Sequence, residues 1–292
     1  MFKKNNKIEI MIAEPHGFCG NENFGVRRAI KLVQEAARQY PNRVYLLGEV
    51  VHNWQVIDWL EKEYGVKTVH SLKEVARNGV VIIRAHGATP KIYKQAKKLG
   101  LIIIDATCPL VVQVHQEVKR LVAEGKKILY LVSDKNHDEA VGVAGEAPAK
   151  VELATLEELD KIKIFEPEKT VILTQTTLSI LDTKEALEKL KRKYPGLTIK
   201  PHICLATTQR QEAIIKLSRD SDLAVIVGST TSSNSNRLKD VAEKTGAKAY
   251  LVDKADNLQK KWFTKKKKVV VSSGASTPEW VLDEVIKKIK NL

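Results

Sequence analysis

The sequence is poor in cysteine and has no long hydrophobic run. Cysteine accounts for 3 of its 292 residues, an odd number that is too small for a fold stapled by disulfides. No apolar stretch reaches the roughly 18 residues that a membrane-spanning helix needs. The charged N-terminal residues also lack the apolar core of a signal peptide. We therefore expect a cytoplasmic protein with no membrane association.

Several familiar catalytic signatures are also missing. The sequence contains no GxGxxG after a strand, no GxxxxGK[ST], no HExxH and no GxSxG. The formal net charge of +14 raises the question of nucleic-acid binding. Most of the excess is lysine spread along helix faces, which favours a solvated surface. We therefore expect no nucleic-acid partner, although a basic protein attracts an anionic substrate.

Short apolar runs alternate with helical patterns along the whole chain. The runs are β-branched and continuous, which is typical of parallel strands that are buried on both faces. Apolar residues recur every three to four positions at 26–37 and 111–122, as in helices with one buried face. This alternation predicts an α/β fold with mainly parallel sheets. The predicted strands are 8–13, 44–47, 80–83, 101–104, 128–132, 171–173, 223–227 and 269–271.

The three cysteines divide the chain into three similar units. Cys19 and Cys108 are 89 residues apart, Cys108 and Cys204 are 96 apart, and 88 residues follow Cys204. Each cysteine follows an apolar or extended run and is followed closely by a helical pattern. We predict three small α/β domains with a common plan, whose strand ends converge at the centre if the domains surround a pseudo-threefold axis. The predicted domains are 20–107, 108–203 and 204–281 together with 1–19, followed by a C-terminal helix or tail at 282–292.

The later strands of each unit also end in polar residues. Ligand sites of open parallel sheets lie at the carboxyl ends of the strands, so these groups are candidates for one site. Their hydrogen-bond donors suit a phosphate, especially near helix N-termini. Glu139 is a candidate proton source, provided that burial keeps part of it protonated. The candidate donors are His52, His86, Thr176, Ser232, Ser233, Asn234 and Ser276, and His137 also follows such a strand.

Three thiolates without a fourth leave a metal centre with one open position. Zinc with three cysteines and a water satisfies this donor set. A four-iron cluster held at three corners satisfies it as well. No Cys-x-x-Cys pair is present, so the ordinary structural zinc pattern is absent. A threefold set of donors favours the cluster, because a cubane has this symmetry along its diagonal.

Nine ordered motifs resemble the hydroxymethylbutenyl diphosphate reductases, the last enzymes of the methylerythritol phosphate route to isoprenoids. The resemblance extends from about residue 8 to residue 278, which is nearly the whole chain. The motifs are GFC with FGVRRAI, EVVHN, RAHG, DATCPLV, NHDE, TQTTLS, ICLATTQRQ, SSNSNRL and GASTPE.

The resemblance implies a reductase that converts (E)-4-hydroxy-3-methylbut-2-enyl diphosphate to isopentenyl and dimethylallyl diphosphate with two electrons and two protons. It implies a pseudo-threefold trefoil of three small α/β domains around one central 4Fe-4S cluster, which has an open iron and three ligands, Cys19, Cys108 and Cys204. Glu139 and Thr176 would bind the substrate hydroxyl and relay protons. Electrons would come from a ferredoxin or a flavodoxin. The diphosphate would be held by His52, His86, His137, Ser232, Ser233, Asn234 and Ser276.

Two other functions fit the residues when the resemblance is set aside. An open-site iron–sulfur hydro-lyase would act on another small anion and would turn over without a reductant. A basic iron–sulfur or zinc protein could instead bind nucleic acid and sense the redox state, with steeply salt-dependent binding. The second function would not need Glu139, Thr176 and the Ser-Ser-Asn run at strand ends.

The first cysteine motif departs from the family pattern. Residues 20–23 stand between Cys19 and the Phe-Gly-Val at the start of the helix, as if four residues had been inserted. They contain glycine and asparagine, which favour a local turn. We hypothesise that the cluster still forms but is less stable or less active than without the insertion.

Deletion of residues 20–23 tests this hypothesis. We expect the shortened protein to retain its iron longer in air, or to turn over faster, because the ligand loop then matches the family length. Iron per chain and reduction rate are measured side by side with the full-length protein. Equal iron content and equal rate would contradict the hypothesis.

Overall fold

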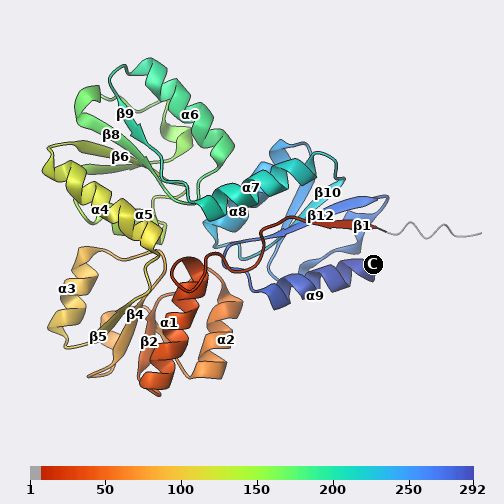
Figure 1. Ribbon diagram of the computed structural model, residues 1–292, viewed down its shortest axis with the longest axis horizontal. Coiled ribbons are helices and arrows are strands. Elements are labelled where there is room, and N and C mark those ends of the chain that lie inside the picture. Colours follow the sequence, from red (N-terminus) through yellow and green to blue (C-terminus); the bar gives the residue numbers. More distant parts are fainter. Residues whose placement is uncertain (1–7) are drawn as a thin grey trace, which may run out of the picture. The chain divides into compact units, whose positions relative to one another are not determined.

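The computed structural model describes residues 8–292. Within these residues, twelve strands form three four-stranded sheets, and every neighbouring pair of strands is parallel. Figure 1 shows each sheet with its helices. The α/β class and the parallel sheets predicted from the sequence are thereby confirmed. The chain divides into two compact units. One unit comprises Gly20–Cys204, and the other comprises the segment that ends at Cys19 together with Leu205–Leu292. The domain boundaries drawn from the sequence stay predictions.

The first sheet of the Gly20–Cys204 unit has the strand order β3-β2-β4-β5. Its inner strands are apolar throughout, and Leu46 and Ile82 are buried because helices cover both faces. Helix α3 packs on the face of Tyr45 and Val81, whereas α1 and α2 pack on the opposite face. The elements are β2 (Val44–Leu47), β3 (Lys67–Val69), β4 (Val80–Ile83), β5 (Ile102–Asp105), α1 (Gly25–Gln39), α2 (Trp54–Tyr64) and α3 (Pro90–Lys98).

The second sheet of this unit has the order β7-β6-β8-β9. Helices α4 and α5 pack on the face that carries Tyr130 and Leu173. Helix α6 packs on the face that carries Leu129 and Ile172. The elements are β6 (Lys127–Leu131), β7 (Val151–Ala154), β8 (Thr170–Thr174), β9 (Thr198–Lys200), α4 (Pro109–Ala123), α5 (Asp138–Ala144) and α6 (Ile180–Lys193).

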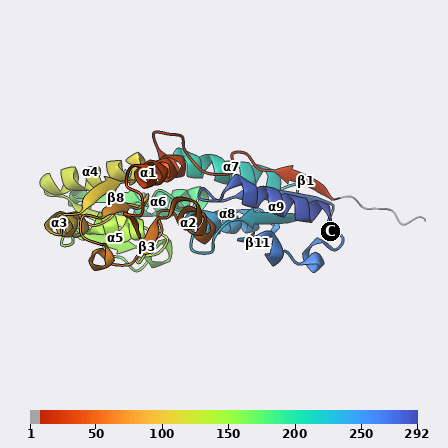
Figure 2. The ribbon, with the colours of Figure 1, turned by 90° about the horizontal axis from the view of Figure 1, so that it is seen from below.

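The third sheet lies in the other unit and has the order β1-β12-β10-β11. Helices α7 and α8 cover one face through Ile214 and Leu238, and α9 covers the other face. Helices on both faces of a sheet can be followed in Figure 1 and, from a direction turned by 90°, in Figure 2. The elements are β1 (Glu9–Ile12), β10 (Leu223–Val227), β11 (Lys248–Val252), β12 (Lys268–Ser273), α7 (Leu205–Ser218), α8 (Ser233–Lys244) and α9 (Glu279–Lys290).

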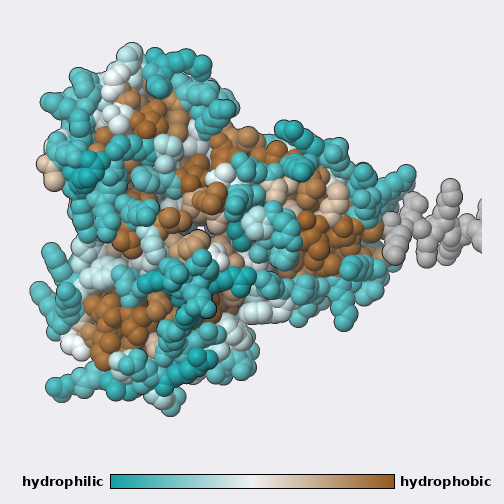
Figure 3. Space-filling view, in the orientation of Figure 1, coloured by the Kyte–Doolittle hydropathy of each residue, from teal (hydrophilic) through white to brown (hydrophobic). Residues whose placement is uncertain are grey.

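Short 3-10 helices complete the connections. They are η1 (Leu72–Glu74), η2 (Leu156–Glu158), η3 (Pro167–Lys169), η4 (Ala255–Asn257) and η5 (Lys260–Phe263). None of the helices described in residues 8–292 is long and apolar enough to cross a membrane. Hydrophilic side chains cover much of the face seen in Figure 3, as expected for the solvated helix surfaces inferred from the lysine distribution.

All eight strands predicted from apolar runs are present. The runs did not reveal β3, β7, β9 and β11, which lie at sheet edges. Each of these strands has a polar or exposed residue in a short segment, KTV, VELA, TIK or KAYLV. Edge strands are hydrogen-bonded on one side only, so they need less apolar surface than the inner strands that the hydrophobic pattern detects.

Candidate active site

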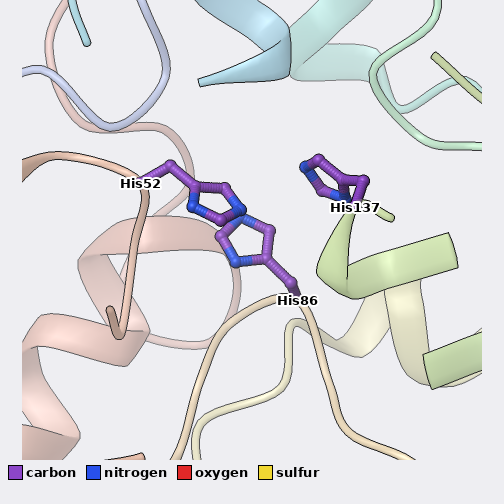
Figure 4. A group of neighbouring side chains, drawn as sticks. All are labelled: His52, His86 and His137. Atoms are coloured by element: carbon purple, nitrogen blue, oxygen red, sulfur yellow. The ribbon is translucent and has the colours of Figure 1, made fainter. Parts of the chain in front are cut away.

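Three histidines from two neighbouring sheets meet in the Gly20–Cys204 unit. His52 follows β2, His86 follows β4, and His137 is the N-cap residue of α5. The His52 and His86 rings stack with their centroids 4.1 Å apart, and the His137 ring lies 5.0 Å from His52 and 5.5 Å from His86. Figure 4 shows the three rings facing one another. One ring nitrogen from each lies within 4.8 Å of the others, so one small ligand can contact all three.

Burial keeps two of these imidazoles, those of His86 and His137, neutral at pH 7. Burial lowers the pKa of His86 well below its ordinary value, and the neighbouring His52, His137 and Arg84 lower it further. The pKa of His137 falls to about 4, chiefly through burial and then through His52. Its Nδ1 accepts the backbone N–H of Glu139 at 3.1 Å, which leaves its Nε2 as the N–H of the neutral ring. Neutral imidazoles bind an anion through N–H donation rather than through full charges.

Two carboxylates and one guanidinium lie beside the imidazoles. Glu49 Oε2 is 3.4 Å from His52 Nδ1, and Asp138 Oδ2 is 3.8 Å from His52 Nε2. Arg84 Nη1 forms an ion pair with the same Asp138 oxygen at 2.9 Å. Arg84 and Asp138 were not among the residues singled out from the sequence.

Glu139 places a carboxyl group in the interior, next to Thr176. The residue is 1% exposed, so it is buried as a proton source at this position requires. Oε1 accepts the Thr176 N–H at 2.9 Å, and Oε2 accepts the Thr176 hydroxyl at 2.8 Å. Burial raises the pKa of Glu139, while the hydrogen bonds from Thr176 and Tyr130 oppose this shift. The carboxyl can therefore hold a proton at a higher pH than an exposed glutamate.

Tyr130 is a partner of this carboxyl that sequence reasoning missed. Its hydroxyl donates to Glu139 Oε1 at 2.9 Å, and the side chain is fully buried in β6. Burial raises the pKa of Tyr130 well above its usual value, with Glu139 adding to the shift, so the phenol remains a donor. A tyrosine inside a strand has the pattern of a core residue, and the sequence carries no signal of its bond to a residue on the following helix.

The other unit carries the hydroxyl and amide candidates. Ser232 is the N-cap of α8 and accepts the Ser235 N–H at 3.3 Å, and Ser233 is the first residue of that helix. Ser276 is buried beyond the end of β12. Asn234 is 4% exposed, and its Oδ1 and Nδ2 have no hydrogen-bond partner among residues 8–292. An amide buried without partners is costly, which marks it as a place for a polar ligand.

The three cysteines occupy equivalent positions, one at the end of each strand–loop segment. All are thiols rather than disulfides, and all have intermediate exposure. The N–H of Cys108 donates to Ala85 O at 2.9 Å, that of Cys204 to Thr176 O at 3.0 Å, and that of Cys19 to Ala275 O at 2.9 Å. Two of these acceptors, Ala85 and Ala275, stand next to the candidate residues His86 and Ser276. The third acceptor, Thr176, is itself a candidate residue. The three thiols therefore share the same local setting, each behind a backbone hydrogen bond to a segment with a candidate polar residue.

Residues 20–23, which follow Cys19, form a closed turn. The Asn21 N–H donates to Phe24 O at 3.1 Å, and Glu22 pairs with Lys31 of α1 at 2.7 Å. Gly20 has φ +82°, and a Cβ there would lie 2.0 Å from Phe24 O, so the turn requires glycine at this position. The helix α1 still begins at Gly25. The local turn that the glycine and asparagine predict is thus present.

The fold and these groups define a class: an α/β protein of three parallel sheets with thiol, imidazole and buried carboxyl groups after its strands. The family of the LytB protein matches residues 10–290, and the chain belongs to this family.

Individual relatives agree with this assignment over nearly the full length. The chain is 40% identical to the 4-hydroxy-3-methylbut-2-enyl diphosphate reductase of Wolbachia pipientis subsp. Culex pipiens (strain wPip), covering 97% of this chain and 92% of that protein. It is 41% identical to the reductase of the same name from Neisseria meningitidis serogroup C (strain 053442), covering 98% and 88%.

A solved structure is also similar. The E-1-hydroxy-2-methyl-but-2-enyl-4-diphosphate reductase of Plasmodium falciparum superposes with a TM-score of 0.90 at 34% identity, over 96% of this chain and 87% of that one. The family resemblance stated from the motifs is therefore confirmed.

Proposed function

We propose that this protein reduces (E)-4-hydroxy-3-methylbut-2-enyl diphosphate to isopentenyl diphosphate and dimethylallyl diphosphate in isoprenoid biosynthesis. The relatives at about 40% identity carry the name of this reductase. The observation in the molecule that carries the proposal is the buried Glu139 carboxyl. It accepts two hydrogen bonds from Thr176 and stands two residues after His137, one of the three clustered histidines. A proton source beside neutral donors for an anion is what a reductive dehydroxylation of a diphosphate requires.

Cys19, Cys108 and Cys204 are proposed to hold one 4Fe-4S cluster. Their reduced thiols and matching backbone hydrogen bonds support this ligand set, and the absence of a fourth cysteine from the sequence leaves one iron open. When bound, such a cluster supplies electrons one at a time and an iron that can accept an oxygen ligand. The remaining tasks of the reaction belong to the side chains of the chain itself.

Binding of the diphosphate falls to the imidazoles and to the hydroxyl and amide groups. His86 and His137 offer N–H donors without the desolvation cost of two charges, because burial has already made them neutral, and the His52 ring stacks on His86 beside them. The unpartnered Asn234 amide supports a polar ligand at the start of α8. The proposed diphosphate residues are His52, His86, His137, Ser232, Ser233, Asn234 and Ser276, with Thr176 at the hydroxyl end of the substrate.

Glu139 and Thr176 are proposed to handle the protons. Substrate, two electrons and two protons give the product and one water, so the leaving hydroxyl needs a proton as its carbon–oxygen bond breaks. The raised pKa of Glu139 lets it hold a proton at a higher pH than an exposed glutamate does. The Thr176 hydroxyl lies 2.8 Å from Glu139 Oε2, so it can pass a proton between that carboxyl and the substrate oxygen.

The electrons are proposed to come from a ferredoxin or a flavodoxin in the cytoplasm. The formal net charge of +14 supports docking of an acidic redox protein, because opposite charges speed encounter.

The direct test is turnover of the anaerobically reconstituted protein. We expect it to reduce hydroxymethylbutenyl diphosphate when a reduced low-potential dye is supplied, with about four irons per chain in the same sample. Product formation and iron content are measured together, with an otherwise identical reaction lacking the dye as the control. Full iron loading without turnover would contradict the reductase, and turnover without the dye would instead indicate a hydro-lyase.

Replacement of Tyr130 by Phe tests the proton source. The Tyr130 hydroxyl stabilises the ionised Glu139 carboxyl, so its removal raises the pKa of Glu139 further. A protonated Glu139 is active, so the rate falls as pH rises through this pKa. We therefore expect the alkaline limb of the pH–rate profile of Y130F to move to higher pH.

Tyr45→Phe is the matched control for this variant. Tyr45 is a buried strand tyrosine of the other sheet in the same unit, 8% exposed, and packs with Tyr93 and Leu72 rather than with Glu139. Removal of the Tyr45 hydroxyl should leave the alkaline limb of the pH–rate profile in place. An unmoved or downward-shifted limb in Y130F would contradict the role of Glu139 as the proton donor.

A further inference from the structure

An ion pair connects the two sheets directly beside the three histidines. Arg84 follows β4 and stands two residues before His86, and Asp138 is the first residue of α5, between His137 and Glu139. Their side chains meet at 2.9 Å, and both are about three-quarters buried, with exposures of 25% and 24%. The pair thus lies between segments that carry site residues in the two sheets of one unit.

The fold leaves room for the Arg84 side chain over the end of β2. Gly48 has φ +69°, and a Cβ at this position would lie 2.8 Å from Arg84 Nη1. A larger residue would therefore both strain the backbone and displace the guanidinium. Gly48 directly precedes Glu49 in the loop that leads to His52. The guanidinium is held close to all three histidine-bearing segments.

The charges around the imidazoles make Arg84 necessary for an anion site. Asp138 Oδ2 lies 3.8 Å from His52 Nε2 and Glu49 Oε2 lies 3.4 Å from His52 Nδ1, so two carboxylates contact the imidazole group. Two of the imidazoles, those of His86 and His137, bring no full positive charge, since burial keeps them neutral. Arg84 is the cation that these contacts place at the group. Without it, an incoming diphosphate meets uncompensated negative charge.

We propose that Arg84 is a charge-compensating positioning residue of the diphosphate subsite: it neutralises Asp138 so that His52, His86 and His137 can accept an anion. This inference rests on the proposed diphosphate function of the three histidines. It differs from a purely structural clamp, which would need both partners equally. Compensation needs Arg84 only as long as Asp138 is charged.

Replacement of Arg84 and replacement of Asp138 are therefore expected to have opposite effects on anion binding. Arg84→Gln should weaken the binding of inorganic diphosphate by about tenfold at low salt, because Asp138 is left unpaired at the subsite. Asp138→Asn should bind as tightly as the wild type or more tightly, because the repelling charge is gone and the guanidinium is free. The double variant R84Q/D138N should return to within about threefold of the wild type.

Isothermal titration of the iron-loaded protein with inorganic diphosphate measures these affinities. Arg77→Gln is the matched control, because Arg77 precedes the amino end of β4 whereas Arg84 follows its carboxyl end. It removes the same charge from the chain and should leave the affinity unchanged. Thermal unfolding of each variant checks that the fold persists, and D138N remains informative even if R84Q unfolds.

Equal losses in R84Q and D138N, without recovery in the double variant, would overturn the inference and leave a structural clamp. A loss in R77Q as large as that in R84Q would overturn it too, since net charge would then be the cause. A wild-type protein that binds no diphosphate would overturn the diphosphate subsite itself, and the inference with it. These outcomes separate the failure of the inference from the failure of the proposed function.

Discussion

Parallel strand order is the constraint on which the candidate site depends. Every neighbouring pair in the three sheets is parallel, so the carboxyl ends of the strands in a sheet lie at one edge. His52 and His86 follow two strands of one sheet, and His137 and Thr176 follow two strands of the next. The loops at these edges can carry polar residues because helices cover the faces and bury the apolar runs. These candidate polar residues therefore lie in the loops after the strands, where the fold does not require hydrophobic side chains.

Burial shifts the pKa values of the histidines and of the glutamate in opposite directions. It lowers the pKa of His86 and His137, which keeps the imidazoles neutral, and raises that of Glu139, which favours its protonated form. Both shifts reduce the charge on the site before an anion arrives. Tyr130 limits the shift of Glu139 through a hydrogen bond. Burial, rather than any single ion pair, therefore accounts for a proton donor beside neutral anion-binding groups.

The sequence predicted all the inner strands and the edge strands β1 and β5, and it named the three histidines that lie together, but it did not predict the contacts between segments. Continuous β-branched runs such as 80–83 and 223–227 mark strands buried on both faces, whereas the short polar edge strand Lys67–Val69 gives no comparable pattern. Glu139 stood out by its position after a predicted strand, but its burial could not be read from the sequence. The bond from Tyr130 to Glu139 and the pair of Arg84 with Asp138 depend on packing between different elements, which no local pattern encodes.

The central claim is that Glu139 delivers a proton to a bound diphosphate substrate, and Glu139→Gln tests it most directly. Glutamine keeps the shape of the side chain but cannot donate a carboxyl proton. The account predicts that the iron-loaded variant binds isopentenyl diphosphate within about threefold of the wild type, while its reductase turnover falls by about 100-fold or more. Turnover within about threefold of the wild type, at equal iron content, would contradict it.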